Sequence, residues 1–205
     1  MRSRRPSHAL AALRAARHDG RMRIEIVEGD ITTHDVDVIV NAANSTLLGG
    51  GGVDGAIHAA AGPRLLDACR AIREERYPQG LPVGESVVTP GFDLAARWVI
   101  HTVGPNWHAG ERAVALLGSC FFTSLELAVE IDASSIAYPA ISAGAYGWDV
   151  HEVAHVARRA LHGWELATAQ DDGDDGQPRA HGIDLVRFVL FSPVARAAFE
   201  QEFVV

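Results

Sequence analysis

The sequence predicts an α/β fold, a sandwich in which helices pack on a sheet whose central strands run parallel. Two observations indicate this class. Short apolar runs typical of buried strands alternate with longer segments of helical periodicity. Two of those runs are followed by loops of small and polar residues, and such loops carry function at the carboxyl ends of parallel strands. A length of 205 residues with 48% hydrophobic content suits one domain with one core.

Six runs are expected to be strands, because they are rich in Val and Ile or alternate between apolar and polar residues. In most of the segments between these strands, apolar residues recur at the spacing of a helix. Gly62-Pro63 should divide the first of these into two helices or kink it. The expected strands are 22–27, 36–40, 86–89, 98–103, 135–141 and 185–191, with a long loop over 41–52. The expected helices are 53–75, 112–131, 149–169 and one from about Val194.

Two segments are expected to lie outside the regular fold. Residues 1–20 contain five Arg and no acid before Asp19, which resembles a targeting segment in composition, but the apolar part is too short and too charged for a secretory signal. We expect a loosely ordered extension at 1–20, followed by a single domain over 21–205. The acidic, Gly-containing segment 170–181 is expected to be a solvated loop.

The charge balance narrows the class of partner. Formal net charge is −8, and every basic residue is Arg, as in proteins from high-GC bacterial genomes. An acidic chain disfavours nucleic acid as a partner, and no stretch approaches the ~20 consecutive apolar residues that a membrane helix needs. If the ligand is a phosphate, we expect backbone amides and helix N-termini to bind it. Cys69 and Cys120 lack CxxC spacing, which favours packed thiols in a reducing compartment, the cytoplasm.

The segment from Asn41 to His58 is the most informative. A buried strand ends in polar amides, four consecutive Gly follow, and a helix begins at about Val53. Free N–H groups at a helix N-terminus, approached closely through glycine, outline a phosphate cradle; a merely flexible glycine loop is the alternative. Asp54 and His58, spaced i, i+4, lie on one face of that helix near the cradle, although a first-turn acid is also favoured by the helix dipole alone.

A second loop has the same placement. Residues 142–147, Ser-Ala-Gly-Ala-Tyr-Gly, follow a strand and precede a helix, so two small-residue loops could hold a diphosphate between them. Tyr146 would then stack on a sugar, or it packs against the core.

The ordered motifs together resemble the macrodomain family, and within it the MacroD-type ADP-ribosyl hydrolases. The resemblance covers residues 22 to about 203. It implies a three-layer α/β/α sandwich with a mixed, largely parallel central sheet. The motifs that carry it are Gly29-Asp-Ile-Thr32, Asn41-Ala-Ala-Asn44, Gly49–Gly52 with Val53-Asp54-Gly55 and His58, Ala61-Gly-Pro63, His101-Thr-Val-Gly-Pro105 and Ala140-Ile-Ser-Ala-Gly-Ala-Tyr-Gly147.

The resemblance implies a site for ADP-ribose. Asp30 and the Ile31 backbone would bind the adenine amino group and base, and Phe191 would pack on the adenine. Asn41, Asn44 and Asp54 would lie at the distal ribose with Tyr146. The phosphates would be bound by the first loop, Gly50, Gly51, Gly52 and Val53, and by the second loop, Ser142, Ala143, Gly144, Ala145 and Tyr146.

The activity implied is hydrolysis of the ester that joins ADP-ribose to Glu or Asp side chains of mono-ADP-ribosylated proteins, with no cofactor and no metal. Asn41, Asn44, Asp54 and His58 are the implied catalytic residues, acting on a positioned water. A non-catalytic ADP-ribose reader and an O-acetyl-ADP-ribose deacetylase are the alternatives. The chain departs from the family in having Trp148-Asp149 where an aromatic residue and Pro are common, and Ser142-Ala143 where Ser-Thr is frequent.

Two further motifs suggest other functions. His151-Glu-Val-Ala-His155 matches the HExxH pattern of zinc proteases, but no third ligand is evident at the expected spacing. Gly50-x-Gly52-x-x-Gly55 matches a dinucleotide-binding fingerprint, but it begins well after its strand ends. Neither protease nor oxidoreductase is therefore favoured.

Overall fold

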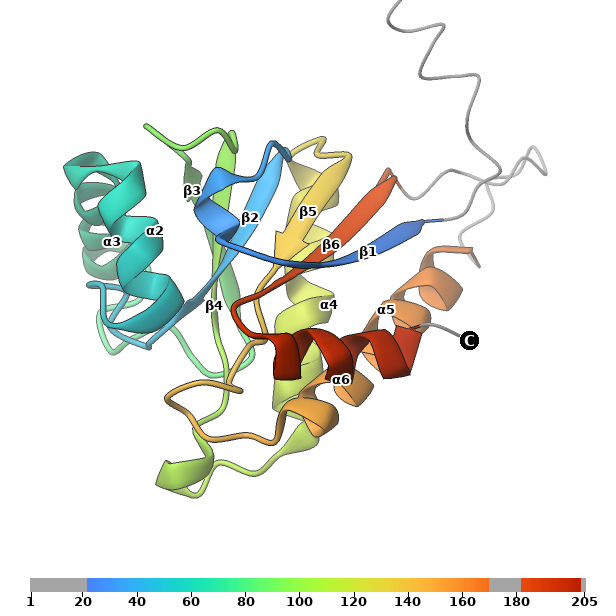
Figure 1. Ribbon diagram of the computed structural model, residues 1–205. Helices are drawn as coiled ribbons and strands as arrows, with labels where there is room; N and C mark the ends of the chain where they lie inside the picture. Colours follow the sequence, from blue (N-terminus) through green and yellow to red (C-terminus); the bar gives the residue numbers. More distant parts are fainter. Residues whose placement is uncertain (1–21, 170–181, 204–205) are drawn as a thin grey trace, which may run out of the picture.

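A mixed six-stranded sheet forms the middle layer of the protein (Figure 1). The computed structural model describes residues 22–169 and 182–203, so the extension expected at 1–20 and the loop expected at 170–181 lie outside the described residues. The strand order is β1-β6-β5-β2-β4-β3, and every neighbouring pair is parallel except β3 with β4. The strands are β1 (Arg23–Glu28), β2 (Val38–Ala43), β3 (Ser86–Pro90), β4 (Trp98–Val103), β5 (Ser135–Tyr138) and β6 (Leu185–Leu190).

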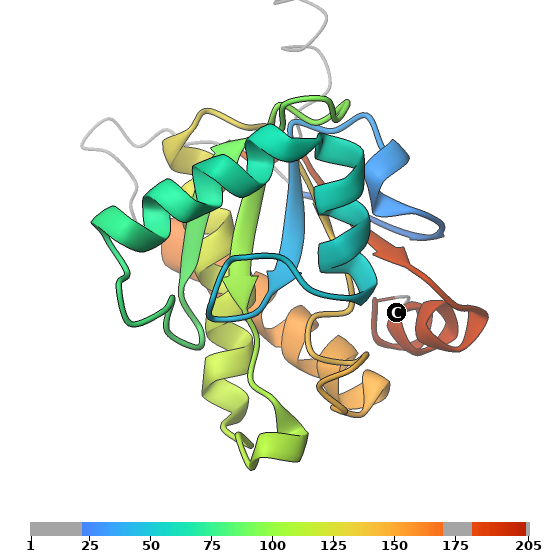
Figure 2. The same ribbon diagram turned by 90° about the vertical axis from the view of Figure 1, so that its left-hand side faces the viewer.

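Helices cover both faces of this sheet, which confirms the predicted three-layer α/β/α sandwich (Figures 1 and 2). One face carries α2 (Gly52–Ala61) and α3 (Pro63–Glu75), and the other carries α4 (Val114–Glu130), α5 (Val150–Ala169) and α6 (Pro193–Phe203). Short 3-10 helices, η1 (Ile31–Thr33) and η2 (Trp107–Ala109), follow β1 and β4.

The alternation of side chains along β2 explains why both layers are needed. Val38 and Val40 join the core beneath α4 and α5, whereas Ile39 and Ala43 join the core beneath α2 and α3. Successive residues of a strand point to opposite faces, so a strand that is apolar at consecutive positions must be covered on both sides. Asn41 belongs by this alternation to the α2 and α3 face, and its side chain is fully buried.

Several boundaries differ from the sequence-based expectations. The loop expected over 41–52 begins later, because β2 continues through Ala43 in register with β4. The expected 112–131 helix begins at Val114 because Ala113 is extended, and the 135–141 strand ends at Tyr138, just before Pro139. The break at Gly62 separates two helices, with Gly62 at φ 78° and Pro63 opening α3.

Asp37 joins the amino-terminal ends of β2 and β5, away from the loops at the carboxyl ends. Its Oδ2 accepts hydrogen bonds of 2.9–3.1 Å from the backbone N–H and hydroxyl groups of Ser134 and Ser135. Burial alone would raise the pKa of Asp37, but these hydrogen bonds outweigh burial and lower it. The carboxylate therefore ties the two central strands together.

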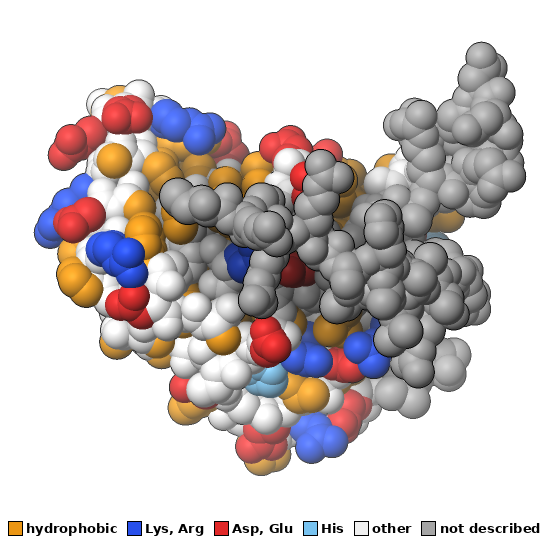
Figure 3. Space-filling model, turned by 90° about the horizontal axis from the view of Figure 1, so that it is seen from above, with side chains coloured by type: hydrophobic (Ala, Val, Ile, Leu, Met, Phe, Trp, Pro, Cys, Tyr) orange, Lys and Arg blue, Asp and Glu red, His pale blue; other side chains and the backbone are white. Residues whose placement is uncertain are grey.

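The surface near the amino-terminal ends of β2 and β5, which Figure 3 shows from above the view of Figure 1, carries mixed charge. On its coloured part, acidic and basic side chains lie interspersed among apolar ones (Figure 3). Among the described residues, no helix has the length and apolar character needed to cross a membrane.

Candidate functional site

A cavity of about 750 Å³ lies at the carboxyl ends of the parallel strands. The N-terminus of α2, the loop after β5 and the start of α6 surround it. Every residue predicted to bind ligand lines this cavity, as do Asn44 and Asp54 of the predicted catalytic set, whereas Asn41 and His58 do not. The predicted residues on its wall are Asp30, Ile31, Asn44, Gly50, Gly51, Gly52, Val53, Asp54, Ser142, Ala143, Gly144, Ala145, Tyr146 and Phe191.

At Gly50 the first loop leaves little room for a side chain. A Cβ added to Gly50 would lie 3.0 Å from Oδ2 of Asp54 and 3.1 Å from Nδ2 of Asn44. Gly51 is the N-cap of α2 and offers no side-chain cap, and Gly52 has φ +61°. The first N–H groups of α2 have no partner within the helix and lie beside the cavity, where the positive end of the helix dipole favours an anion.

The second loop is held by its own backbone. Ser142 has φ 66°, and its carbonyl accepts from the N–H of Trp148 at 3.1 Å. Gly147 donates to the carbonyl of Gly144 at 3.0 Å, and a side chain on Gly147 would collide with the ring of His108. Within the described part of the chain, the backbone N–H groups of Gly144, Ala145 and Tyr146 donate no hydrogen bond to another backbone group. The loop therefore offers a second set of amide donors to the cavity.

No Arg or His stands among the described residues that line the cavity. An anion there would be held by amides from the two loops rather than by side-chain cations. This is the arrangement expected for a phosphate ligand of an acidic protein.

Asp30 and Phe191 lie at the other end of the cavity from Asp54 along the strand order, after β1 and β6. Asp30 caps η1: its Oδ1 accepts from the N–H of Thr32 at 2.9 Å and from the hydroxyl of Thr32 at 2.8 Å. The backbone hydrogen bond, followed by the hydroxyl, lowers the pKa of Asp30, so this group stays an ionised acceptor. Phe191 is 90% exposed although it is aromatic, which leaves its ring free to cover a flat ligand.

Asp54 is the buried acid of the site. Its side chain is only 6% exposed, and its Oδ1 accepts from Nδ2 of Asn41 at 2.6 Å. Nε2 of His58 lies 3.5 Å from the same oxygen, is buried and has no hydrogen-bond partner in the described structure. Burial raises the pKa of Asp54, and it outweighs the lowering influence of the Asn41 hydrogen bond and the His58 charge. A carboxyl group with a raised pKa next to an anion cradle accepts a proton more readily than an ordinary aspartate does.

Three buried polar side chains continue from Asp54 into the protein. Asn41 on β2 contacts Nδ1 of His101 on β4 at 3.0 Å, and Nε2 of His101 contacts Oγ1 of Thr89 on β3 at 2.9 Å. The Sγ of Cys69 on α3 lies 3.8 Å from the same Nε2. Burial lowers the pKa of His101 to about 3, with a further contribution from His58, and burial raises the pKa of Cys69 to about 12. His101 is therefore a neutral ring and Cys69 a protonated thiol.

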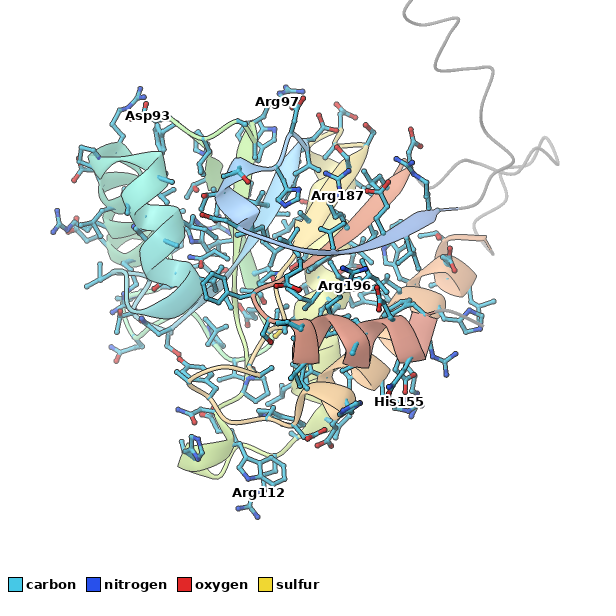
Figure 4. The ribbon with its side chains drawn as sticks, in the orientation of Figure 1. Asp93, Arg97, Arg112, His155, Arg187 and Arg196 are labelled. Atoms are coloured by element: carbon cyan, nitrogen blue, oxygen red, sulfur yellow. The ribbon has the colours of Figure 1, made fainter. Side chains whose placement is uncertain are left out.

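In the described part of the chain, His58, Cys69 and His101 each offer one atom that could bind a metal ion, and these three atoms lie within 4.8 Å of one another. We assign no metal to this group, because both nitrogens of His101 already contact Asn41 and Thr89 and the thiol holds its proton. The HExxH motif forms no cluster of this kind in the described chain. His151 is exposed on α5, and His155 lies beside α6, where its Nδ1 is 3.4 Å from Oε2 of Glu202 (Figure 4).

Some residues of the site were not found from the sequence. His101 on β4 and Thr89 on β3 lie within expected strands, and the sequence pattern gives neither of them a place in the site. The alternation that places Asn41 with Ile39 on one face of β2, together with parallel pairing of Asn41 and His101, would have indicated their contact. The start of α6 also contributes to the wall. The residues there that the sequence did not predict are Val194 and Ala195, together with Ser192 just before the helix.

The two departures from the family pattern have visible consequences. Trp148 is 2% exposed and packs edge-on against Trp107, with ring centroids 5.4 Å apart, so the second loop is anchored to the η2 segment. Ala143 lines the cavity without a hydroxyl, which leaves the backbone donors of that loop in place.

Comparison with known proteins agrees with this geometry. The Macro domain family model matches residues 40–157. A macro domain-containing protein of Streptomyces griseus is 49% identical over 87% of this chain and 93% of its own length, and one of Xanthomonas axonopodis is 54% identical over 70% of this chain and 81% of its own.

Solved structures give the same result. The Oceanobacillus iheyensis macrodomain with ADP superposes with a TM-score of 0.76 at 41% identity, covering 86% of this chain and 87% of that one. The Trypanosoma brucei macrodomain in complex with ADP-ribose has a TM-score of 0.73 at 32% identity, covering 87% and 68%. With the family model, close sequence relatives and the shared fold in agreement, this chain belongs to the Macro domain family.

Proposed function

We propose that this chain binds ADP-ribose and hydrolyses the ester that joins ADP-ribose to Glu or Asp side chains of proteins, as a MacroD-type hydrolase without a metal. The observation that carries the proposal is the placement of Asp54. This buried carboxyl group with a raised pKa lines a cavity between two amide-rich loops suited to a diphosphate. The complexes of related macrodomains with ADP and ADP-ribose support the choice of ligand.

The ligand would extend along the carboxyl edge of the sheet. Adenine would lie between Asp30, which accepts from its amino group, and the exposed ring of Phe191, with the Ile31 backbone also at the base. The two loops would hold the phosphates through N–H groups. The distal ribose would then reach Asn44 and Asp54, with Tyr146 against the sugar.

The chemistry needs an oriented water more than a nucleophilic side chain, because an ester is already activated. Oδ1 of Asp54 is occupied by Asn41, so Oδ2, which lies toward Gly50, is the oxygen available to a water in the cavity. Water would attack the ester carbonyl, Asp54 would accept its proton, and the bond to the ribose oxygen would break as that oxygen regains a proton. The products are the free carboxylate and ADP-ribose.

Asn41 and His58, which the cavity does not reach, would support this step rather than touch the substrate. Asn41 donates to Asp54, and His58 lies beside it at 3.5 Å. Asn44 is held by its own loop, since its Nδ2 donates to the carbonyl of Gly49 at 3.0 Å, and it can orient the ribose from that position.

The same geometry would serve release of acetate from O-acetyl-ADP-ribose, which differs only in the group beyond the distal ribose. Nucleic acid is not favoured as a partner, because the chain carries a formal net charge of −8 and the basic side chains visible in Figure 3 lie interspersed with acidic ones. The two buried free cysteines support a cytoplasmic location, and the continuous sandwich of the described residues supports one domain over 21–205.

The test is a time course of ADP-ribose release from a Glu-modified protein in the presence of EDTA, with a Ser-modified protein in parallel. We expect release from the Glu-linked substrate alone. Binding of ADP-ribose by calorimetry without release from either substrate would show a reader, unless O-acetyl-ADP-ribose is hydrolysed. Absence of ADP-ribose binding would overturn the proposal altogether.

A further inference from the structure

A line of hydrogen bonds runs from the cavity into the sheet beneath Asp54. Nδ2 of Asn41 lies 2.6 Å from Oδ1 of Asp54 and 3.0 Å from Nδ1 of His101, and Nε2 of His101 lies 2.9 Å from Oγ1 of Thr89. Asn41 and His101 are direct partners in the pairing of β2 with β4. Asn41, His101 and Thr89 are at most 2% exposed and Asp54 is 4% exposed, so water does not compete for these bonds.

The donors and acceptors of this line determine one another. A carboxylate oxygen only accepts, so the amide atom that faces Asp54 must be the nitrogen. The same nitrogen faces Nδ1 of His101, which must therefore carry a lone pair. The ring proton is then on Nε2, from which it is donated to the hydroxyl of Thr89.

Removing the acceptor at Nδ1 would free the amide to turn. A donor at that place would face the NH₂ group of Asn41, and the amide would rotate to present its oxygen instead. That oxygen would then lie next to Oδ1 of Asp54, where two acceptors repel each other. The lone pair on Nδ1 of His101 is thus what keeps an N–H directed at Asp54.

We propose that His101 is a positioning residue for the reaction at Asp54: it fixes the Asn41 amide with its N–H toward Oδ1, which favours the charged form of the carboxyl group and leaves Oδ2 facing the cavity. The inference rests on the proposed hydrolase function and adds a residue that the cavity does not reach. It also assigns a role to a buried histidine that does not line the cavity.

The surroundings of Asp54 leave few other groups for this task. The titratable side chains near it are His58 on its own helix, Cys69 on α3, His101 on β4 and Tyr146 in the loop after β5. Cys69 keeps its proton, and burial, followed by the charges of Glu111 and Asp54, raises the pKa of Tyr146. The hydrogen bond from Asn41 is the larger of the two influences that lower the pKa of Asp54, ahead of the charge of His58.

A matched pair of variants tests the proposal. Asn carries its side-chain oxygen on Cγ, the place that Nδ1 occupies in His, so His101→Asn retains an acceptor toward Asn41. Gln extends to the place of Nε2, so His101→Gln retains a group toward Thr89 but loses that acceptor. Thr89→Val, nearly equal in volume to the native residue, removes the partner of Nε2 and is expected to act in the same direction as His101→Gln, with a smaller effect.

Two readouts are needed on the full-length protein. The first is the titration of the Asp54 carboxyl carbon by ¹³C NMR, and the second is the pH dependence of kcat on the Glu-linked substrate. In His101→Gln we expect the Asp54 midpoint and the acid limb of kcat to move up by about one pH unit, with a plateau ~10-fold lower and ADP-ribose affinity within ~2-fold. In His101→Asn we expect the Asp54 midpoint and the pH dependence of kcat to lie close to those of the unmodified protein.

The outcomes separate this inference from the proposed function. If all three variants titrate like the unmodified protein, or if His101→Asn shifts as far as His101→Gln, His101 fills space and positions nothing. If the NMR midpoints separate as expected but the unmodified protein releases no ADP-ribose, the hydrolase is wrong while the control of Asp54 by His101 stands.

Discussion

Gly50 and Asp54 face each other so closely that a methyl group on Gly50 would lie 3.0 Å from Oδ2 of Asp54. The backbone of the first loop therefore forms one wall around the oxygen that we assign to water activation. Gly51, the next residue, has open space where its Cβ would be and a negative φ of −102°. Neighbouring glycines thus have different roles in the same loop.

Gly50→Ala should destabilise the protein even without ligand, because the added methyl group must displace Asp54 or Asn44. We expect a loss of ~1–3 kcal/mol, measured by denaturant unfolding. Gly51→Ala is the control and should stay within ~0.5 kcal/mol. Equal stability of the two variants would mean that the loop yields easily at Gly50.

Asp54→Asn should abolish most turnover while retaining binding, because the amide fills the same space but accepts no proton. We expect kcat to fall by ~10²–10⁴-fold, the range of general base catalysis, and the Kd for ADP-ribose to change by less than ~5-fold. Turnover comparable to that of the unmodified chain would remove Asp54 from the mechanism.

Gly52→Glu should prevent binding itself. The residue has φ +61°, which disfavours any side chain, and the new carboxylate would enter the proposed phosphate cradle. Calorimetry should show at least ~100-fold weaker ADP-ribose binding, because the Glu carboxylate would repel the ligand phosphate at short range in a partly buried site. Gly163→Glu, on the exposed side of α5, carries the same charge and should bind normally. Undiminished affinity in Gly52→Glu would overturn the cradle.

Phe191→Ala should weaken ADP-ribose binding by ~5–10-fold through lost stacking on the adenine. Because the ring is 90% exposed, the free energy of unfolding should change by less than ~0.5 kcal/mol. Calorimetry with ADP-ribose and with ribose phosphate separates the effects, since a ligand without adenine should not distinguish the variant from the unmodified protein.

Asp37→Asn should lower stability at neutral pH by ~1–3 kcal/mol, because the bonds from Ser134 and Ser135 lose their charged acceptor. The pKa of Asp37 is lowered in the folded protein, so its contribution is full above the unfolded value near 3.9 and disappears as pH falls through the folded value. The difference between Asp37→Asn and the unmodified protein should therefore shrink below about pH 4. The exposed Asp35→Asn serves as control, and a pH-independent difference would contradict this account.

The parts of the site that the sequence predicted are those set by local geometry. A strand, a run of glycines and a helix start follow one another directly around Gly50, and each feature dictates a backbone shape without help from distant residues. The extent of β2 was not predictable in this way. Asn41 is polar and resembles the start of a loop, yet parallel pairing with His101 keeps it in the strand. The buried contact between these two residues depends on the pairing of strands far apart in the chain, which no local pattern reveals.

The amide-lined wall described above is encoded by the shape of the main chain. Uncharged donors release no counterions, so affinity for a diphosphate should vary little with ionic strength, unlike that of a pocket built from arginines. Replacing Ala143 or Ala145 by another small residue would preserve every donor. Recognition of the anion therefore depends on the small size of the residues at these positions. One small residue can replace another there without loss of the backbone donors.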